Sequence, residues 1–144
     1  RGEIYGGELV LDYQASQVWH LRGSYAYLHE TQWFDEAGGD DVRPLEDLFD
    51  PQHQMTLTSS LDLTARTELD FSLRHVTDLP NMELDAYTEL DARIGWHARP
   101  DLEVFLVGRN LLHDQHPEFY SNQIILSPNG EIQRSVSAFV RWSF

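Results

Sequence analysis

The feature that most constrains the fold of this chain is a regular alternation of apolar and polar residues over its last segment, residues 132–144. Every even-numbered position from Ile132 to Phe144 except Arg134 is apolar, and every odd-numbered position except Phe139 is polar. Successive side chains of a strand lie on opposite faces, so the segment predicts a strand with one apolar and one polar face. A strand of about ten residues that ends in aromatic residues is typical of a transmembrane β-barrel.

The same alternation recurs in earlier segments, and no segment has the pattern of an amphipathic helix. The sequence predicts seven long strands, at residues 7–13, 19–28, 55–62, 68–75, 89–96, 102–109 and 132–144. Their connections are alternately short and longer, which is typical of outer-membrane barrels with tight periplasmic turns and long extracellular loops. In the last long connection, a turn from Pro128 to Gly130 predicts a small two-stranded ribbon that uses residues 124–126.

Aromatic residues gather at one end of the predicted apolar face. If every short turn lies at one end of the sheet, these aromatic residues lie at that end: Tyr13, Trp19, Trp96, Trp142 and Phe144. An aromatic belt at a lipid–water boundary explains this arrangement, since these rings are apolar with a polar edge. Chance clustering in the core of a soluble β-sandwich is the alternative explanation.

The opposite predicted face carries charges of both signs. Its ionisable residues are Glu8, Asp12, His20, Arg22, Glu68, Asp70, Arg74, Glu89, Asp91, Arg93, Glu103, Arg109 and Arg141. Mixed charges fit the water-filled or plugged lumen of a barrel, and they fit the solvent-exposed face of a soluble sheet equally well.

The composition argues against several classes of function. The chain has 144 residues, no cysteine, and 24 acidic against 10 basic residues, which gives a formal net charge of −14. The absence of cysteine excludes disulfides and thiolate metal sites, and the acidic balance argues against a nucleic-acid partner. The mean hydropathy of −0.45 resembles that of a soluble protein, but alternating barrel strands also average to a nearly neutral value.

The odd number of predicted strands suggests that the chain is part of something larger. A complete single-chain bacterial barrel has an even number of strands, and its two ends usually lie in the periplasm. Here the last predicted strand ends on the short-turn side, whereas the first begins on the long-loop side. Seven strands are also fewer than the roughly eight that a barrel packed with side chains needs. We therefore expect a C-terminal fragment of a longer barrel.

Several stretches, taken in order, resemble the late strands of TonB-dependent outer-membrane receptors. They are Gly6–Tyr13 with Trp19–Leu28, then Ala86–Trp96, then the block Gly108–Asp114 with His116–Phe119, and finally the terminal Arg-Trp-Ser-Phe of residues 141–144. The block Gly-Arg-Asn-Leu-Leu-His-Asp is the most specific of these, and the resemblance covers nearly the whole chain.

The resemblance implies that residues 1–144 are an antiparallel up-and-down transmembrane β-barrel fragment, strands 16 to 22 of a 22-stranded barrel. It implies TonB-energised uptake of a scarce nutrient across the outer membrane of a Gram-negative bacterium. The expected nutrient is an iron–siderophore complex, and haem, cobalamin or a sugar are the alternatives. The implied partners are the remaining strands and plug domain of the full receptor, the TonB system and outer-membrane lipid. The plug and the TonB-contacting segment are not in this sequence.

The resemblance also assigns a role to the end of the chain. A terminal strand that ends on an aromatic residue resembles the signal read by the barrel-assembly machinery, here carried by Val140, Trp142 and Phe144.

Four aromatic loop residues are the candidates for ligand contact: Trp33, Phe34, Phe119 and Tyr120. Aromatic side chains beside charges make effective recognition surfaces. Packing within the loops, or a second belt at a lipid boundary, is the alternative role.

The acidic loop residues Asp35, Asp40 and Asp41 are the candidates for a metal site, because Ca²⁺ takes carboxylate oxygens from flexible loops. The spacing is not that of an EF-hand, and a solvated acidic loop is the alternative. The seven histidines show no catalytic spacing, so neither an enzyme nor a cofactor is expected. A soluble β-sandwich that binds a ligand is the alternative to the barrel.

Overall fold

The structure, a computed structural model, describes residues 2–33, 44–46, 50–79, 84–119 and 130–144. Its strands are β1 (Gly2–Ser16), β2 (Trp19–Trp33), β3 (Pro44–Glu46), β4 (His53–Thr64), β5 (Thr67–Val76), β6 (Tyr87–Arg99), β7 (Leu102–Arg109), β8 (Gln115–Phe119), β9 (Gly130–Gln133) and β10 (Ser135–Trp142). The described residues contain no helix. The prediction of an all-β chain is confirmed.

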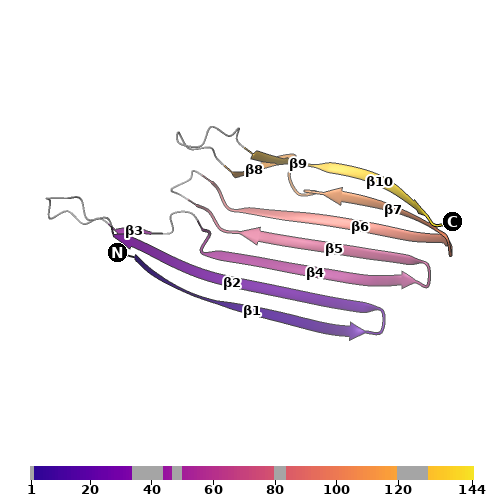
Figure 1. The fold of residues 1–144 in the computed structure, drawn as a ribbon, viewed down its shortest axis with the longest axis horizontal. Helices are drawn as coiled ribbons and strands as arrows, with labels where there is room; N and C mark the ends of the chain where they lie inside the picture. Colours follow the sequence, from indigo (N-terminus) through magenta and orange to yellow (C-terminus); the bar gives the residue numbers. More distant parts are fainter. Residues whose placement is uncertain (1, 34–43, 47–49, 80–83, 120–129) are drawn as a thin grey trace.

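Eight of these strands form one antiparallel sheet in the order β1-β2-β4-β5-β6-β7-β10, with β3 paired to the end of β2. Each long strand lies beside the long strand that precedes it in the chain, so the sheet is an up-and-down meander of seven long strands. The last predicted strand, residues 132–144, is divided: Ile132 and Gln133 belong to β9 of a separate sheet, and only β10 (Ser135–Trp142) belongs to the meander. Figure 1 shows a single curved layer with β1 and β10 at its two edges. The sheet is not closed.

The connections are short at one end of the sheet and long at the other, as predicted (Figure 1). The three tight turns join β1 to β2, β4 to β5 and β6 to β7, and the C-terminus lies at the same end. Backbone hydrogen bonds tie this end together: the amide of His97 donates to the carbonyl of Arg66 at 2.8 Å, and the amide of Ser143 to that of Asp101 at 3.0 Å.

A two-stranded ribbon lies in the last long connection, and it is formed by β8 and β9. β8 and β9 pair antiparallel, with His116 opposite Ile132 and Pro117 opposite Glu131. The sequence prediction used residues 124–126, which lie outside the described residues. The period-2 signal of the segment Gln115–Phe119 is too short to distinguish it from a loop.

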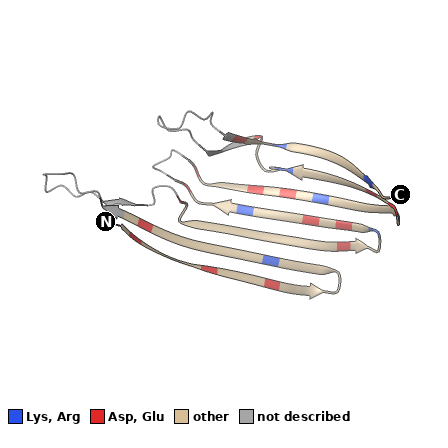
Figure 2. Cartoon of the chain, viewed as in Figure 1, with Lys and Arg blue, Asp and Glu red and all other residues tan. Residues whose placement is uncertain are grey.

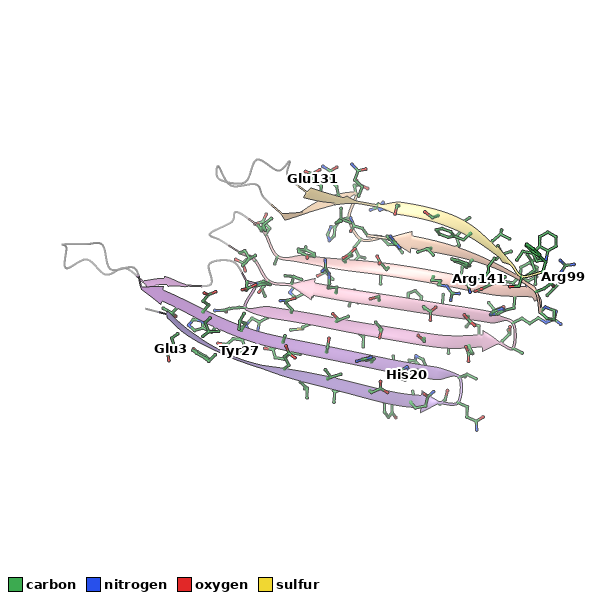
Figure 3. All side chains as sticks on the ribbon, viewed as in Figure 1. Glu3, His20, Tyr27, Arg99, Glu131 and Arg141 are labelled. Carbon is green, nitrogen blue, oxygen red and sulfur yellow. The ribbon has the colours of Figure 1, made fainter. Side chains whose placement is uncertain are left out.

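The sheet has almost no core of its own. Among the described residues, only three apolar side chains are buried: Val76, Leu79 and Leu84. They lie where β5 leads toward β6, and Leu79 and Leu84 form a small antiparallel bridge. The side chains of the long strands therefore stand on two open faces, as Figure 3 shows.

Candidate functional site

One face of the sheet is apolar from β1 to β10. Directly opposed residues of antiparallel strands have their side chains on the same face. Leu69 is opposed by Ile94, which is in turn opposed by Leu106, and Leu106 is opposed by Ala138 at the β10 edge. Similar pairs continue through β4 and β2, so the prediction that the apolar positions share one face is confirmed. The exposed members of this apolar face are Leu9, Leu11, Tyr13, Trp19, Met55, Leu57, Phe71, Leu73, Ile94, Trp96, Leu106, Val136, Val140 and Trp142.

The apolar face is too large to be left in water. The exposed fractions of its side chains run from 37% for Leu73 to 69% for Val140. Burying a large apolar side chain is worth about 1.5–3 kcal/mol, so covering the exposed half of this face would gain on the order of 10–20 kcal/mol. That gain is comparable with the whole stability of an ordinary domain. The face must therefore meet an apolar phase or an apolar surface.

A tryptophan girdle marks the short-turn end of the apolar face. The register places there the predicted residues Tyr13, Trp19, Trp96 and Trp142, at the ends of β1, β2, β6 and β10. The indole Nε1 of Trp19 donates to Oγ of Ser59 at 3.0 Å, and that of Trp142 donates to a carboxylate oxygen of Asp101 at 3.0 Å. Each indole thus keeps a polar contact while its rings stand on the apolar face.

A tyrosine–histidine girdle marks the opposite end of the same face, and the sequence prediction missed it. It consists of Tyr5, Tyr25, Tyr27, His29 and His53, which the register aligns with the apolar positions of β1, β2 and β4. The Tyr5 and His29 rings lie 4.9 Å apart, and those of Tyr27 and His53 lie 5.2 Å apart. The Tyr25 hydroxyl and Nδ1 of His53 share a hydrogen bond of 2.8 Å. Figure 3 labels Tyr27 near the long-loop end.

The separation of the two girdles matches the thickness of a hydrocarbon layer. Trp19 and His29 lie on the same strand, so ten residue steps of about 3.3 Å separate them by roughly 33 Å along it. The strand tilt of about 40° that is typical of outer-membrane barrels would reduce this to roughly 25 Å, the height of their apolar band. Aliphatic side chains such as Leu57 and Ile94 occupy the interval.

The polar face carries ion pairs that join neighbouring strands and converge on Arg93 of β6. Its Nη1 donates to Glu68 at 3.0 Å and to Asp70 at 2.9 Å, and its Nη2 donates to Glu103 at 2.7 Å. The other oxygen of Glu103 accepts a hydrogen bond from Arg141 at 2.9 Å. Charges of β5, β6, β7 and β10 are thereby linked, and Figure 2 shows them distributed along the sheet.

A glycine makes room for the Arg93 guanidinium. A Cβ built on Gly95 would lie 3.0 Å from Nη2 of Arg93, so any larger residue would displace a group held by carboxylates. The guanidinium also stands over the Phe105 ring at 5.2 Å. The sequence identified Arg93 as a polar-face residue, but its partners depend on the register, which period alone does not define.

Three side chains that could bind a metal ion each bring one ligand atom within 4.8 Å of the others: Glu68, His97 and Glu103. Both carboxylates already accept hydrogen bonds from Arg93, and Glu68 also bonds to Nε2 of His97 at 3.0 Å. A cation between them would have to displace the guanidinium, so this group does not support a metal site.

Asn110 forms a corner at the end of β7. It is fully buried, with 0% exposure, and its φ of 50° lies in the left-handed region that Asn tolerates better than most residues. Its backbone amide donates to a carboxylate oxygen of Asp91 at 3.0 Å, and its side-chain Nδ2 donates to the carbonyl of Ile132 at 2.9 Å. One residue thus links β6, β7 and β9.

The rest of the block that follows Asn110 also ties the ribbon to the sheet. The amide of Leu111 donates to the carbonyl of Leu90 at 2.9 Å, and its side chain packs over Gly108, where a Cβ would lie 2.8 Å from it. The amide of Arg134 donates to the carbonyl of Asp114 at 2.9 Å, and the two side chains form a 3.2 Å ion pair. The block that the sequence analysis singled out is therefore a structural joint.

Most of the predicted ligand and metal residues lie outside the described residues: Phe34, Asp35, Asp40, Asp41 and Tyr120. Trp33 ends β2 and Phe119 ends β8, but the structure does not describe their side chains. The ligand and metal predictions therefore stay predictions. Val140, Trp142 and Phe144, by contrast, are described and exposed at the β10 edge.

No protein-family model, no curated protein and no solved structure matches this chain. The resemblance to outer-membrane receptors therefore stays a prediction from the sequence. No helix among the described residues is long and apolar enough to cross a membrane.

Proposed function

We propose that this chain is part of the wall of a transmembrane β-barrel in a bacterial outer membrane. The observation that carries the proposal is the apolar face, with aromatic girdles at its two ends that lie roughly 33 Å apart along β2, on a sheet with almost no core of its own. Lipid covers this face, and the charged face lines the lumen. The short turns lie on the periplasmic side and the long connections on the outer side.

The edges of the sheet support the same proposal. In the described residues, β1 pairs with strands on one side only, and so does β10. Unpaired edges invite further strands, and a closed barrel removes them. We infer that other strands of the barrel pair with these two edges, so that the chain contributes one part of the wall of a larger barrel.

We further propose that the barrel is a TonB-dependent receptor that imports a scarce nutrient. An iron–siderophore complex is the first candidate for this nutrient, and haem, cobalamin or a sugar are the alternatives. It is supported by the sequence resemblance, above all by the block that contains Asn110. A plug domain and the TonB system are its partners. The barrel-assembly machinery would read Val140, Trp142 and Phe144, whose exposure at an edge strand leaves them available.

The competing arrangement is a soluble β-sandwich that binds a ligand, with a second sheet over the apolar face. A sandwich core needs apolar side chains throughout. Here the face carries aliphatic residues in the middle and rings with polar groups, such as Trp19 and Tyr25, at both ends. This layout favours a layer of lipid with two watery boundaries.

Single-cysteine variants test the membrane proposal, because the chain has no cysteine of its own. Leu57→Cys and Leu106→Cys place a fluorescent label on the apolar face, whereas Thr58→Cys and Val107→Cys place it on the polar face. We expect brominated lipids to quench only the first pair in reconstituted membranes. Purification as a compact monomer without detergent, with the first pair unreactive to every reagent, would instead establish the sandwich.

Growth and uptake test the nutrient proposal separately. Deletion of the gene should abolish uptake of one ferric siderophore under iron limitation, while uptake of an unrelated nutrient stays unchanged. Normal uptake of every iron complex tested would direct the search to the other substrates.

A further inference from the structure

Histidines on the two faces of the sheet differ in their hydrogen-bond partners. On the polar face, His20 bonds to a carboxylate oxygen of Asp12 at 2.7 Å, and His97 bonds to one of Glu68 at 3.0 Å. On the apolar face, the partners of His53 and His75 are hydroxyl groups. A carboxylate compensates the charge that an imidazole gains on protonation, whereas a hydroxyl does not. His53 and His75 can therefore present a net positive charge to whatever covers the apolar face.

The half-buried rings of His53 and His75 are each anchored through Nδ1. Nδ1 of His53 shares a hydrogen bond of 2.8 Å with the hydroxyl of Tyr25, and Nδ1 of His75 shares one of 2.9 Å with Oγ1 of Thr88. A hydroxyl can donate to a neutral ring and can accept from a protonated one, so both anchors persist when the rings take up a proton. Each anchor leaves Nε2 as the ring nitrogen that can donate to a ligand.

The residues directly opposite His53 and His75 on the neighbouring strands have no formal charge at neutral pH. The rings of Tyr25 and Tyr27 lie 5.9 Å and 5.2 Å from the ring of His53. The opposed residues are Tyr27 and Thr77 for His53, and Met55 and Thr88 for His75.

The charged residues nearby in the sequence do not compensate these two histidines. Arg74 and Glu89, on β5 and β6, pair with each other on the polar face at 3.3 Å. Among the residues that the structure describes, no carboxylate forms an ion pair with His53 or His75, and this includes the exposed Asp50 and Asp78 beside the strand ends. An anion that reached the two rings would not have to displace a carboxylate.

His53 and His75 follow the same slope across the sheet as the tryptophan girdle. Trp96 on β6 lies two residues nearer the short turns than the position in register with Trp19 on β2. At the other end of the face, His53 is in register with Tyr27, and His75 lies two residues nearer the short turns than the position in register with His53. The two rings therefore continue the tyrosine–histidine girdle onto β5, at the height where the proposed hydrocarbon layer gives way to lipid headgroups.

We propose that His53 and His75 form a binding site for the phosphate of an anionic lipid headgroup, and that this site binds more tightly in acid. The two residues are diagonal neighbours, which lie about 7–8 Å apart on adjacent strands, so one phosphate can accept from both Nε2–H groups. Histidine gains its charge between about pH 8 and pH 5, whereas the phosphodiester of a headgroup stays negative over this range. The inference rests on the proposed membrane boundary and adds to it a ligand class and a pH dependence.

Quenching of a fluorescent reporter beside the two histidines tests the site. Leu73→Cys lies on the apolar face of β5, two residues from His75, and carries the label in the whole protein. The protein is reconstituted in phosphatidylcholine vesicles that contain phosphatidylglycerol with brominated chains. We expect the affinity for phosphatidylglycerol relative to phosphatidylcholine to rise about tenfold from about pH 7.5 to about pH 5.5. An unchanged ratio would overturn the proposal.

Histidine variants show whether the pH dependence comes from this pair. The double variant His53→Gln and His75→Gln keeps polar side chains that cannot become charged, so the rise in acid should disappear. The single variant His75→Gln should reduce the rise to about threefold, and it covers the case in which the double variant misfolds. The matched control His20→Gln removes a histidine from the polar face and should leave the full rise. A full rise in either variant of the pair would contradict the proposal.

Inorganic phosphate distinguishes a headgroup site from a site for a free ion. An excess of inorganic phosphate should leave the preference for phosphatidylglycerol in acid as it is in sodium chloride of the same ionic strength. Loss of the preference in phosphate alone would reveal an ion site and overturn the proposal. Brominated phosphatidylcholine should quench Leu73→Cys equally at both pH values. If no brominated lipid quenches this reporter, the membrane proposal fails as well, whereas quenching without a pH-dependent preference defeats the headgroup site alone.

Discussion

Arg93 illustrates how a single residue organises the polar face. Its planar guanidinium has five donors in a fixed arrangement, and it uses them to hold the carboxylates of Glu68, Asp70 and Glu103. Without it, the three carboxylates would face one another across neighbouring strands. Lysine could balance the charge but could not reproduce the forked geometry.

We therefore expect Arg93→Ala to destabilise the protein by about 2–3 kcal/mol, because it leaves three like charges close together and partly desolvated. Arg93→Lys should lose roughly half as much. Urea unfolding in detergent micelles, followed by tryptophan fluorescence, measures both. The control Arg66→Ala, in the exposed β4–β5 turn, should change stability by less than about 0.5 kcal/mol. Equal effects at positions 93 and 66 would refute the role of the ion pairs.

Asn110 combines a strained backbone with a side-chain hydrogen bond, and two substitutions separate the contributions. Asn110→Gly accepts the φ of 50° but loses the bond to Ile132, so we expect a loss of about 1–2 kcal/mol. Asn110→Ala loses the bond and adds backbone strain of about 1 kcal/mol. Hydrogen exchange at the Arg134 amide should accelerate in both variants and more in Asn110→Ala. Exchange that is the same in both would show that the backbone conformation contributes nothing.

At the scale of elements, β4 shows how one strand crosses the whole apolar band. It begins at His53 in the tyrosine–histidine girdle and reaches Leu61, which lies opposite Trp19 in the tryptophan girdle. Leu57 lies halfway between them and is 48% exposed on the apolar face, whereas the next residue, Thr58, points to the polar face. Along β4, a substitution can therefore be placed at a chosen depth in the apolar face, or at a similar depth on the polar face.

An arginine scan along β4 uses this geometry. In lipid vesicles, Leu57→Arg should cost about 2–4 kcal/mol, because it places a charge at the middle of the hydrocarbon layer, while Leu61→Arg near the boundary should cost about 0–1 kcal/mol. Thr58→Arg is the matched control, since it adds the same side chain one residue away on the polar face. Urea unfolding in the same vesicles measures the three values. A cost for Thr58→Arg equal to that for Leu57→Arg would argue against lipid on the apolar face.

At the scale of the whole molecule, the alternation of residues predicted the seven long strands, their order and the separation into two faces. The prediction succeeded because both faces of the sheet are open, so no tertiary contact disturbs the alternation of apolar and polar residues. The strand ends were less predictable. β1 begins at Gly2 and β2 ends at Trp33, beyond the predicted 7–13 and 19–28, because polar and aromatic residues replace the simple alternation there. Three residues of the tyrosine–histidine girdle lie outside the predicted strands for that reason: Tyr5, His29 and His53.

Contacts that depend on register or on long connections could not be predicted. The partners of Arg93 come from the two neighbouring strands β5 and β7, and a shift of one residue would replace them all. β3 has only three residues and begins with a proline, which gives too little pattern to identify a strand. The buried hydrogen bond from Asn110 to Ile132 joins residues that are far apart in the sequence, so no local sequence pattern predicts it.

The two girdles together define a thickness, so the stability of the whole protein should depend on the bilayer around it. In phosphatidylcholine vesicles of increasing chain length, the free energy of unfolding should be highest where the hydrocarbon layer is about 25 Å thick. It should fall on both sides by fractions of a kcal/mol per Å, because mismatch forces either the strands to tilt or the lipid to deform.

The double variant Trp96→Ala and Trp142→Ala removes half of the tryptophan girdle, which weakens the anchoring at the short-turn end and should flatten this dependence. The control Phe139→Ala removes an aromatic ring from the opposite face at a similar height, and it should leave the optimum thickness unchanged. A stability that does not vary with thickness in the unsubstituted protein would mean that the girdles do not lie at lipid boundaries, and that a protein surface covers the apolar face instead.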